Sequence, residues 1–446
     1  MVMEGLTLRC FKRFKMKRTN ITAMVLISAA FAASPMSAQN DYDSYDKFRV
    51  GGYGEVLAKF MTYGNNRWSE ANGASYENRN TVSVPRFVLA FDYKFTSKWI
   101  LSAEIEFESG GTGVAYELED NENYEYEVEV EKGGEVELEQ IHITRLIVPE
   151  FNVRVGHVIV PVGLTNAHHE PINFFGTSRP EGESTIIPST WHETGLELFG
   201  SFGKEWYTFD YQVLVVAGLN GNAFSKHAWA GEADASLLEE DHFTSPGYAA
   251  RIDYRGIPNL RLGASYYFCN NVLANCDKGS EFNDVYGAAR LHICSVDAQY
   301  TNKYLTFRGN CLFGNLGNSY NVSKAVNGYS STSPYSKKAP IAKRAVSYGA
   351  ELGFNLQALT CARCPVLYPF ARYEYYNPQE EVVSRETYTA DNRAEVSMWT
   401  AGLNWKALPN LVFKADYTTR KIGGGDFHHE NEFAIGLAYI GWFWGK

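Results

Sequence analysis

The sequence predicts an all-β fold, a transmembrane antiparallel β-barrel of about 16 strands with long extracellular loops at one end and short periplasmic turns at the other. Three observations predict it. Apolar and polar residues alternate with period two, the links between the alternating segments are alternately short and long, and aromatic residues make up 15% of the 446 positions. No stretch reaches the roughly 18 consecutive apolar residues of a transmembrane helix, so a helical membrane protein is excluded.

The N-terminus has the three parts of a secretory signal peptide, which we expect to be cleaved after Ala38. A segment with six Lys and Arg residues is followed by the apolar run 21–33 and then by small residues. Met16 offers an alternative start with a more ordinary signal length. Removing residues 1–38 leaves 35 basic and 50 acidic residues, a net charge of −15. Residues 39–446 are expected to form one barrel domain, and their acidic balance argues against nucleic acid as a partner.

Each predicted strand presents one apolar and one polar face. Phe87, Leu89, Phe91 and Tyr93 share one parity, and the intervening positions include Asp92. Because successive side chains of a strand point to opposite faces, one set meets an apolar phase and the other meets water. The predicted strands lie near 48–61, 81–95, 99–109, 136–148, 152–160, 191–203, 206–218, 246–255, 260–270, 290–301, 304–314, 345–357, 366–376, 395–406, 411–421 and 432–444.

The links between the strands favour a barrel over a soluble β-sandwich, which would show the same alternation. Short links such as 96–98, 149–150 and 302–303 alternate with long ones. Short turns at one end and long loops at the other are typical of a bacterial outer-membrane barrel, whereas a sandwich mixes loop lengths at both ends. The long links run roughly over 62–80, 110–135, 161–190, 219–245, 271–289, 315–344, 377–394 and 422–431.

Several motifs are similar to a known family. They are Arg154-Val155-Gly156-His157, Pro161-Val162-Gly163, Ser178-Arg179-Pro180-Glu181, Trp191-His192-Glu193-Thr194-Gly195 and the strand Tyr368-Pro369-Phe370-Ala371-Arg372-Tyr373-Glu374. Together they resemble the phosphate-selective porins O and P, as found in Bacteroidetes-type genomes. This resemblance implies a homotrimeric porin of sixteen strands in the bacterial outer membrane, a passive channel with phosphate or other anions among its solutes.

The most acidic segment predicts a hairpin. Eleven acids and one base lie between Glu117 and Glu139, and Gly133-Gly134 can turn two arms that both carry carboxylates. Three interpretations stay open: an acidic rim that attracts cations, a loop site for Ca²⁺ or Mg²⁺, and a solvated loop that keeps the mouth soluble. No other cofactor is expected. The acids of the two arms are Glu125, Glu127, Glu129, Glu131, Glu135, Glu137 and Glu139.

The third long loop is the predicted constriction. In general porins this loop folds back into the barrel, and by that resemblance its polar side chains would narrow the pore. A metal site formed by His168, His169 and Glu170 is disfavoured, because adjacent residues of an extended chain diverge. The residues expected at the constriction are Asn166, His168, His169, Glu170, Arg179, Glu181 and Glu183.

Ion selectivity depends on which charges face the pore. Bases of inward parity would offer a path to anions, and the acids of the strand 99–109 share the water-facing parity. Because no regular ladder of arginines follows any one strand, a cation-preferring or divalent-binding channel is the alternative to a phosphate channel. The strand residues predicted to line the solute path are Arg86, Lys94, Glu104, Glu106, Glu108, Arg154 and Arg308.

Two further expectations concern catalysis and cysteines. We predict no enzyme, because the chain lacks Gly-x-Ser-x-Gly and its strand histidines are dispersed; an outer-membrane enzyme and a surface adhesion barrel are the weaker alternatives. Export to an oxidising compartment favours disulfides. The cysteines that share a hairpin or a loop are Cys294 with Cys311, Cys269 with Cys276, and Cys361 with Cys364.

Overall fold

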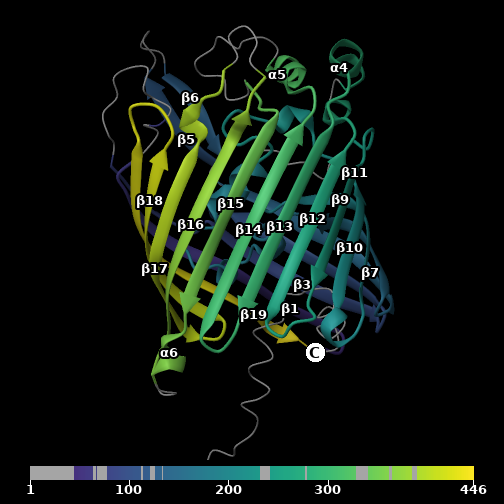
Figure 1. Cartoon of the computed structure of the whole chain (residues 1–446), viewed down its shortest axis with the longest axis vertical. Coiled ribbons are helices and arrows are strands. Elements are labelled where there is room, and N and C mark those ends of the chain that lie inside the picture. The colour runs from purple at the N-terminus through teal and green to yellow at the C-terminus, as the bar shows by residue number, and fades with distance from the viewer. Residues whose placement is uncertain are drawn as a thin grey trace, which may run out of the picture.

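A computed structural model describes residues 45–63, 67, 78–111, 114–120, 126–132, 134–231, 242–276, 279–327, 340–360, 364–383 and 389–445. The predicted signal peptide, Glu125 and Cys361 lie outside the described residues. Within them, sixteen strands form a closed antiparallel barrel in which each strand pairs with its neighbours in sequence and β19 pairs with β1 (Figure 1). The predicted fold class is confirmed.

The barrel strands follow the predicted ranges to within a few residues at most ends. They are β1 (Phe48–Met61), β3 (Arg86–Thr96), β4 (Trp99–Glu108), β7 (Glu135–Val148), β8 (Phe151–Ile159), β9 (His192–Phe202), β10 (Phe209–Val216), β11 (Gly247–Tyr254), β12 (Leu260–Cys269), β13 (Leu291–Thr301), β14 (Leu305–Leu316), β15 (Arg344–Phe354), β16 (Val366–Glu381), β17 (Val396–Leu408), β18 (Leu411–Ile422) and β19 (His429–Gly445).

Three strands lie outside this ring. The predicted strand 81–95 is broken before Pro85 into β2 (Arg79–Ser83), which pairs with the end of β1, and β3. A proline has no N–H to donate to a ladder, which explains a break at that point. The other two are β5 (Val114–Asp120) and β6 (Tyr126–Lys132), which form a separate two-stranded sheet at the long-loop end (Figure 1).

The acidic hairpin predicted around Gly133-Gly134 is therefore wrong. β6 pairs with β5, whereas β7 continues into the barrel between β4 and β8. The register of the observed hairpin places Glu117 opposite Glu129 and Glu119 opposite Glu127. Acidic residues still lie opposite acidic residues, but the strand that pairs with β6 is β5, which precedes it in the chain, and not the segment that follows it. Six of the seven predicted acids are described, and they divide between β6 (Glu127, Glu129 and Glu131) and β7 in the barrel wall (Glu135, Glu137 and Glu139).

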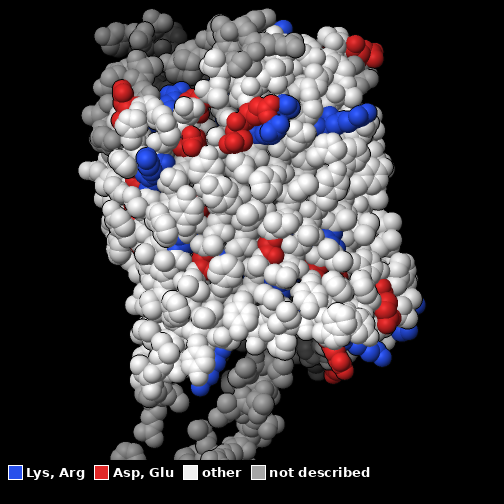
Figure 2. Space-filling model, viewed as in Figure 1, with Lys and Arg blue, Asp and Glu red and all other residues white. Residues whose placement is uncertain are grey.

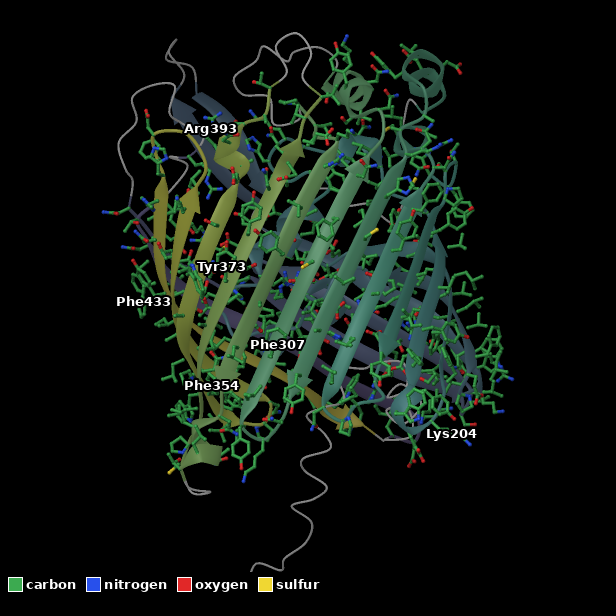
Figure 3. All side chains as sticks on the ribbon, in the orientation of Figure 1. Lys204, Phe307, Phe354, Tyr373, Arg393 and Phe433 are labelled. Atoms are coloured by element: carbon green, nitrogen blue, oxygen red, sulfur yellow. The ribbon has the colours of Figure 1, made fainter. Side chains whose placement is uncertain are left out.

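The outer face of the barrel is a broad apolar band. In Figure 2 the visible lysine, arginine, aspartate and glutamate side chains gather mainly near the two ends, and the belt between them is mostly uncharged. Figure 3 shows Phe307, Phe354, Tyr373 and Phe433 along this wall, with Arg393 toward the long loops and Lys204 toward the short turns. A closed barrel with an apolar exterior satisfies all its backbone hydrogen bonds in lipid. The fold is that of a membrane-spanning barrel.

Short helical segments decorate the loops and turns. In the described residues, no helix combines the length and the apolar character that crossing a membrane would require. The helical segments are η3 (Asn166–His168), η4 (Pro171–Asn173), α3 (Glu181–Ile186), η5 (Glu205–Tyr207), η6 (Gly221–Ala223), η7 (Val272–Asn275), α4 (Gly279–Tyr286), α5 (Ser319–Asn327), α6 (Leu356–Leu359) and η8 (Asn392–Ala394).

One half of the barrel interior is apolar at its long-loop end. Inward residues at that end of β8 to β15 pack against returning loops in a continuous cluster that includes the fully buried Trp229 and Phe224 and the nearly buried Trp191. The Trp229 indole donates to the carbonyl oxygen of Ala342 over 3.0 Å. It lies against Gly314, where a Cβ atom would overlap the ring, so this position requires glycine. The long-loop end of this half is filled by side chains.

Two of the three expected cysteine pairs are not bonded. Cys269, Cys276, Cys294 and Cys311 form no disulfide. The register of β13 and β14 places Cys294 opposite Phe313 and Cys311 opposite Val296, so the two sulfurs are offset along the hairpin. Sharing a hairpin is therefore not enough to bring two cysteines together. Cys364 is disulfide-bonded.

Candidate functional site

The third long loop, residues 160–191 and here called L3, crosses the barrel interior. It leaves β8, touches β1 and β7 through His169, reaches β18 near Gly176, and runs along β15 and β16 as α3 before it returns to β9. Every anchor of L3 described below is a polar side chain on the inner face of a strand or in the loop itself. L3 therefore lies inside the barrel, in contact with strands on different sides of the wall.

Lys414 of β18 is the central anchor of L3. Its Nζ donates to the carbonyl oxygens of Pro171, Phe174 and Gly176 over 2.5, 2.8 and 2.8 Å. Two positions along the strand, Asp416 accepts the backbone N–H of Thr177 over 2.5 Å. Both side chains are buried. Buried polar groups are normally hydrogen-bonded, and here the backbone of L3 supplies their partners. The pair holds the middle of L3 against β18.

The helix α3 is held by a charge pair. Arg420 donates to Glu181 with Nε–oxygen distances of 2.9 and 3.0 Å, and Tyr376 adds a hydrogen bond of 3.3 Å. Burial alone would raise the pKa of the Glu181 carboxyl, but the Arg420 guanidinium outweighs burial and lowers that pKa to about 2. Glu181 is therefore ionised at neutral pH and bonded bidentately to the wall.

Glu183 ties the two ends of L3 together. Its carboxylate accepts the backbone N–H groups of Leu164 and Asn166 over 2.9 and 2.6 Å, and the Asn310 amide over 2.6 Å. Burial raises the pKa of Glu183 to about 7, and the backbone donors oppose that rise. Gly163 has a positive φ of 88° and no room for a Cβ beside the Glu183 carboxylate, so glycine is required there.

His169 joins L3 to the opposite wall. Its Nε2 lies 2.9 Å from Oε1 of Glu139 and 2.9 Å from the Tyr53 hydroxyl, which in turn donates to Glu139 over 2.9 Å. Burial would lower the pKa of His169, but the Glu139 carboxylate outweighs this and raises it to about 10. The neighbouring His168 behaves differently, because burial and the guanidinium of Arg261 lower its pKa well below the usual value.

Three polar cavities lie beside L3. Cavity A, of about 200 Å³, lies between L3 and the wall of β1 to β12, and its charged lining is Arg49, Asp92, Glu104, Arg154, Glu170 and Arg261. Cavity B, of about 160 Å³, lies toward the short turns of β13 to β18. Cavity C, of about 80 Å³, lies beside the wall of β13 to β16. Its lining includes Arg308 and Arg372, which pair with Glu351 and Glu374.

Cavity B differs from the others in its charge. The charged residues that line it are Arg308 and Lys406, accompanied by the amides of Asn173 and Asn404, and no acidic side chain occurs among its described lining residues. Nε of Arg308 lies 2.7 Å from a carboxylate oxygen of Glu351. Lys406 lies over the ring of Tyr368, 5.2 Å from its centroid. The short-turn end of the lumen thus offers donors to an anion.

The basic side chains predicted to line the path lie on the inner face, each with a partner. Arg86 is buried among Glu55, Glu106 and Glu108 at 3.7, 3.3 and 3.8 Å. Arg154 is 2.6 Å from Glu197 and lines cavity A. Lys94 is buried, donates to the carbonyl of Tyr45, and lies outside the three cavities.

The predicted acids and loop residues spread over several environments. Glu106 is buried, Glu104 is half-buried beside cavity A, and Glu108 has 45% of its side chain exposed. Arg179 bonds within L3 to Ser189 and Thr190 over 2.7 and 3.1 Å. The acids on β7 become more buried along the strand, from the exposed Glu135 through the half-buried Glu137 to the fully buried Glu139. Glu127, Glu129 and Glu131 belong to β6.

Sequence reasoning missed the anchors on β18. Lys414, Asp416, Thr418 and Arg420 share one parity and are all buried, while the intervening positions face outward. This period-two polar row was readable from the sequence, where it marks the inner face of the strand. The sequence did not indicate that this row anchors L3, because the residues of L3 that it contacts lie about 240 positions away.

Comparisons with known proteins agree with this architecture. No family model matches the chain. An uncharacterised protein of Aquifex aeolicus (strain VF5) is 24% identical over 421 residues, which cover 92% of this chain and 83% of that protein. Salmonella typhi OmpF, in complex with daunomycin, superposes with a TM-score of 0.53 at 11% identity over 90% of this chain and 99% of its own.

A second solved structure gives the same result. The outer-membrane channel DcaP of Acinetobacter baumannii superposes with a TM-score of 0.50 at 13% identity, covering 88% of this chain and 96% of that one. At such identities the likeness concerns the fold alone. Together with the apolar exterior and the sixteen described strands, it shows that this chain has the fold of outer-membrane porins.

Proposed function

We propose that the protein is a passive channel for small hydrophilic solutes and ions in the bacterial outer membrane, working as a homotrimer. The observation that carries the proposal is the lumen itself, where L3 stands among polar cavities instead of an apolar core. A barrel of sixteen strands is wide enough to hold water when its inner face is polar. The mixed charges beside L3 would screen solutes by size and by charge.

Anion preference is the finer proposal. It is supported by cavity B, where Arg308, Lys406 and two amides face the lumen without an acid in the described lining. Guanidinium and ammonium groups can replace water around phosphate or another small anion. The resemblance of the sequence motifs to phosphate-selective porins points to the same solutes.

Cation preference is the competing proposal, and the β5–β6 hairpin favours it. Its register sets Glu117 and Glu119 opposite Glu129 and Glu127 near the long-loop mouth. Such a concentration of carboxylates raises the local cation concentration and repels anions before they reach cavity B. The same carboxylates would be the ligands of any Ca²⁺ bound in this loop.

Reversal potential in a planar bilayer under a KCl gradient tests both proposals. A preference for chloride that is reduced by Lys406→Gln supports the anion path through cavity B, and competition by phosphate would identify the family's solute. A preference for potassium assigns control to the hairpin. Folded protein that never conducts would overturn the channel proposal. Lys421→Gln, which alters an exposed lysine on the outer face of β18, is the matched control.

A further inference from the structure

A cluster of metal-ligating side chains lies where L3 meets the barrel wall. One ligand atom each from Glu104 on β4, Glu139 on β7 and His169 on L3 lie within 4.8 Å of one another. We propose that these three side chains bind a divalent transition-metal ion, with Zn²⁺ as the best match, and that the ion fastens L3 to the wall.

His169 is oriented as a metal ligand. Its Nδ1 lies 3.2 Å from the carbonyl oxygen of Asn166, and a carbonyl only accepts, so Nδ1 carries hydrogen and donates. In the neutral ring Nε2 then holds the lone pair, and Nε2 is the atom that faces Glu139. Histidines that bind metals generally donate their other ring N–H to a carbonyl or carboxylate in this way. The metal ion would take the place of the proton that Nε2 carries in the metal-free pair.

Glu139 directs one carboxylate oxygen at the His169 ring. The side chain is fully buried, and its Oε2 accepts from the Tyr53 hydroxyl over 2.9 Å. Its Oε1 lies 2.9 Å from Nε2 of His169, so this contact depends on a proton carried by that nitrogen. When Nε2 is deprotonated the two atoms both present lone pairs to each other, and a metal ion between them would satisfy both.

A β-bulge gives Glu139 its direction. Gln140 pairs with Glu104 and Leu138 pairs with Ile105, so Glu139 is an extra residue in β7. The inner face changes parity at this point, from the odd positions up to Glu139 to the even positions from His142 onward. Bulges often redirect a side chain next to a functional site. Here the bulge brings the Glu139 carboxylate to the crossing point of L3.

The local charge and the cavity both favour a cation. Glu106 and Glu170 add two more carboxyl groups around the cluster, while Arg86 is shared among Glu55, Glu106 and Glu108. Glu104, which accepts from the Gln140 amide over 3.0 Å, lines cavity A together with His169. An ion from the lumen can therefore reach the ligands through a water-sized space, as a bindable site requires.

The donor set selects the class of metal. One imidazole and two carboxylates suit Zn²⁺, which takes three protein ligands and a water in open sites. Ca²⁺ and Mg²⁺ prefer oxygen ligands alone, so the imidazole would be idle with them. Tetrahedral bonds of about 2.0–2.1 Å place ligand atoms roughly 3.3 Å apart, which these side chains reach by shifts below about 1 Å.

Calorimetric titration of purified full-length protein in detergent, stripped with EDTA and then given ZnCl₂, tests the proposal. The expected result is one Zn²⁺ per chain, with affinity reduced at least roughly 100-fold in His169→Gln and Glu139→Gln. His168→Gln is the matched control, because this neighbouring histidine lies outside the ligand set, and it should bind as the parent does. Circular dichroism establishes that each variant is folded.

Limited proteolysis provides a second measurement. Zn²⁺ should slow cleavage within L3 in the parent and in His168→Gln, and have no such effect in His169→Gln. If His169→Gln fails to fold, Glu104→Gln replaces it, since Glu104 is only half-buried. A parent protein without stoichiometric Zn²⁺ binding, or equal binding by the His168 and His169 variants, would overturn the site. Conductance is a separate measurement, so the metal proposal and the channel proposal fail independently.

Discussion

The two halves of the barrel interior hold their loops by different means. At the long-loop end of β8 to β15, the inward side chains are apolar and pack against Trp229, Phe224 and other loop residues. On the side formed by β16 to β19 and β1 to β7, L3 is held by Lys414, Arg420 and Glu139 through charged hydrogen bonds. The long-loop end of the first half is closed by packing, whereas polar contacts hold L3 where it passes the cavities.

This difference assigns separate tasks to the two halves. Burial of apolar surface is non-directional and stabilises a plug without excluding other arrangements of similar volume. Charged hydrogen bonds hold a loop in one position, and an unpaired partner is costly when the bond breaks. The position of L3, and with it the shape of the pore, therefore depends on a few polar contacts.

Trp229→Ala should have the largest effect, because it opens the packed half. Removing a fully buried tryptophan costs about 3–5 kcal/mol of stability. We expect the loops above β10 to β14 to loosen and single-channel conductance to rise, measured in planar bilayers. Trp399→Ala, on the outer face with 59% of the residue exposed, is the control and should leave conductance unchanged. Unchanged conductance in Trp229→Ala would show that this half is not what limits the pore.

Lys414→Met tests the polar half. Three carbonyl oxygens of L3 lose a charged donor, which should cost roughly 2–5 kcal/mol of loop attachment. The expected outcome is a larger, noisier conductance with faster proteolysis of L3, in a barrel whose circular dichroism is unchanged. Lys421→Met on the opposite face of the same strand is the control. A quiet, parental conductance would mean that L3 is held without this lysine.

Acid should weaken the same half through Glu181. Its folded pKa of about 2 lies below the ordinary 4.5, so the Arg420 pair contributes stability above about pH 4.5 that is lost as the pH falls toward 2. The effect is on the order of 1–3 kcal/mol. Proteolysis of L3 by pepsin should accelerate over this range, and Glu181→Gln should remove part of the acid dependence. An identical pH profile for the two proteins would exclude this pair as the acid-sensitive contact.

Neutralising the hairpin should have the smallest effect. Replacing Glu127, Glu129 and Glu131 with glutamine removes three charges from the mouth without altering L3. Because exposed charges are screened over a Debye length of about 10 Å at 0.1 M salt, we expect the reversal potential to move toward anion preference by a few millivolts, and less at 1 M. If the shift of the reversal potential persists at 1 M salt, these carboxylates lie closer to the ion path than residues of a solvated loop at the mouth would.

Much of the fold was predictable from the sequence because strand parity and turn residues are local signals. The bounds of β1 were predicted without error, and those of most other strands to within a few residues. The break before Pro85 was missed although proline signals it. The hairpin was mispaired because Gly133-Gly134 is a plausible turn, whereas the true partner of β6 precedes it.

The site was less predictable for physical reasons. L3 was assigned to the interior, but its anchors combine residues from β1, β7, β14, β16 and β18, and no local pattern encodes such pairings. The inward apolar positions Leu214, Ile293 and Leu312 follow the parity rule, yet they face packed loops instead of water. When both faces of a strand are apolar, the sequence indicates that both are buried. It does not indicate whether lipid or packed protein covers each face.

The pairing of the first strand with the last has a consequence for how the chain enters its membrane. β1 and β19 share a ladder that runs from Arg49 opposite Gly445 to Met61 opposite Glu432. Until β19 is available, β1 and β18 both present open edges, which lipid cannot satisfy and which invite pairing with another chain. Insertion must therefore await the final strand, and a chain truncated before β19 should aggregate in the aqueous compartment instead of residing in the bilayer.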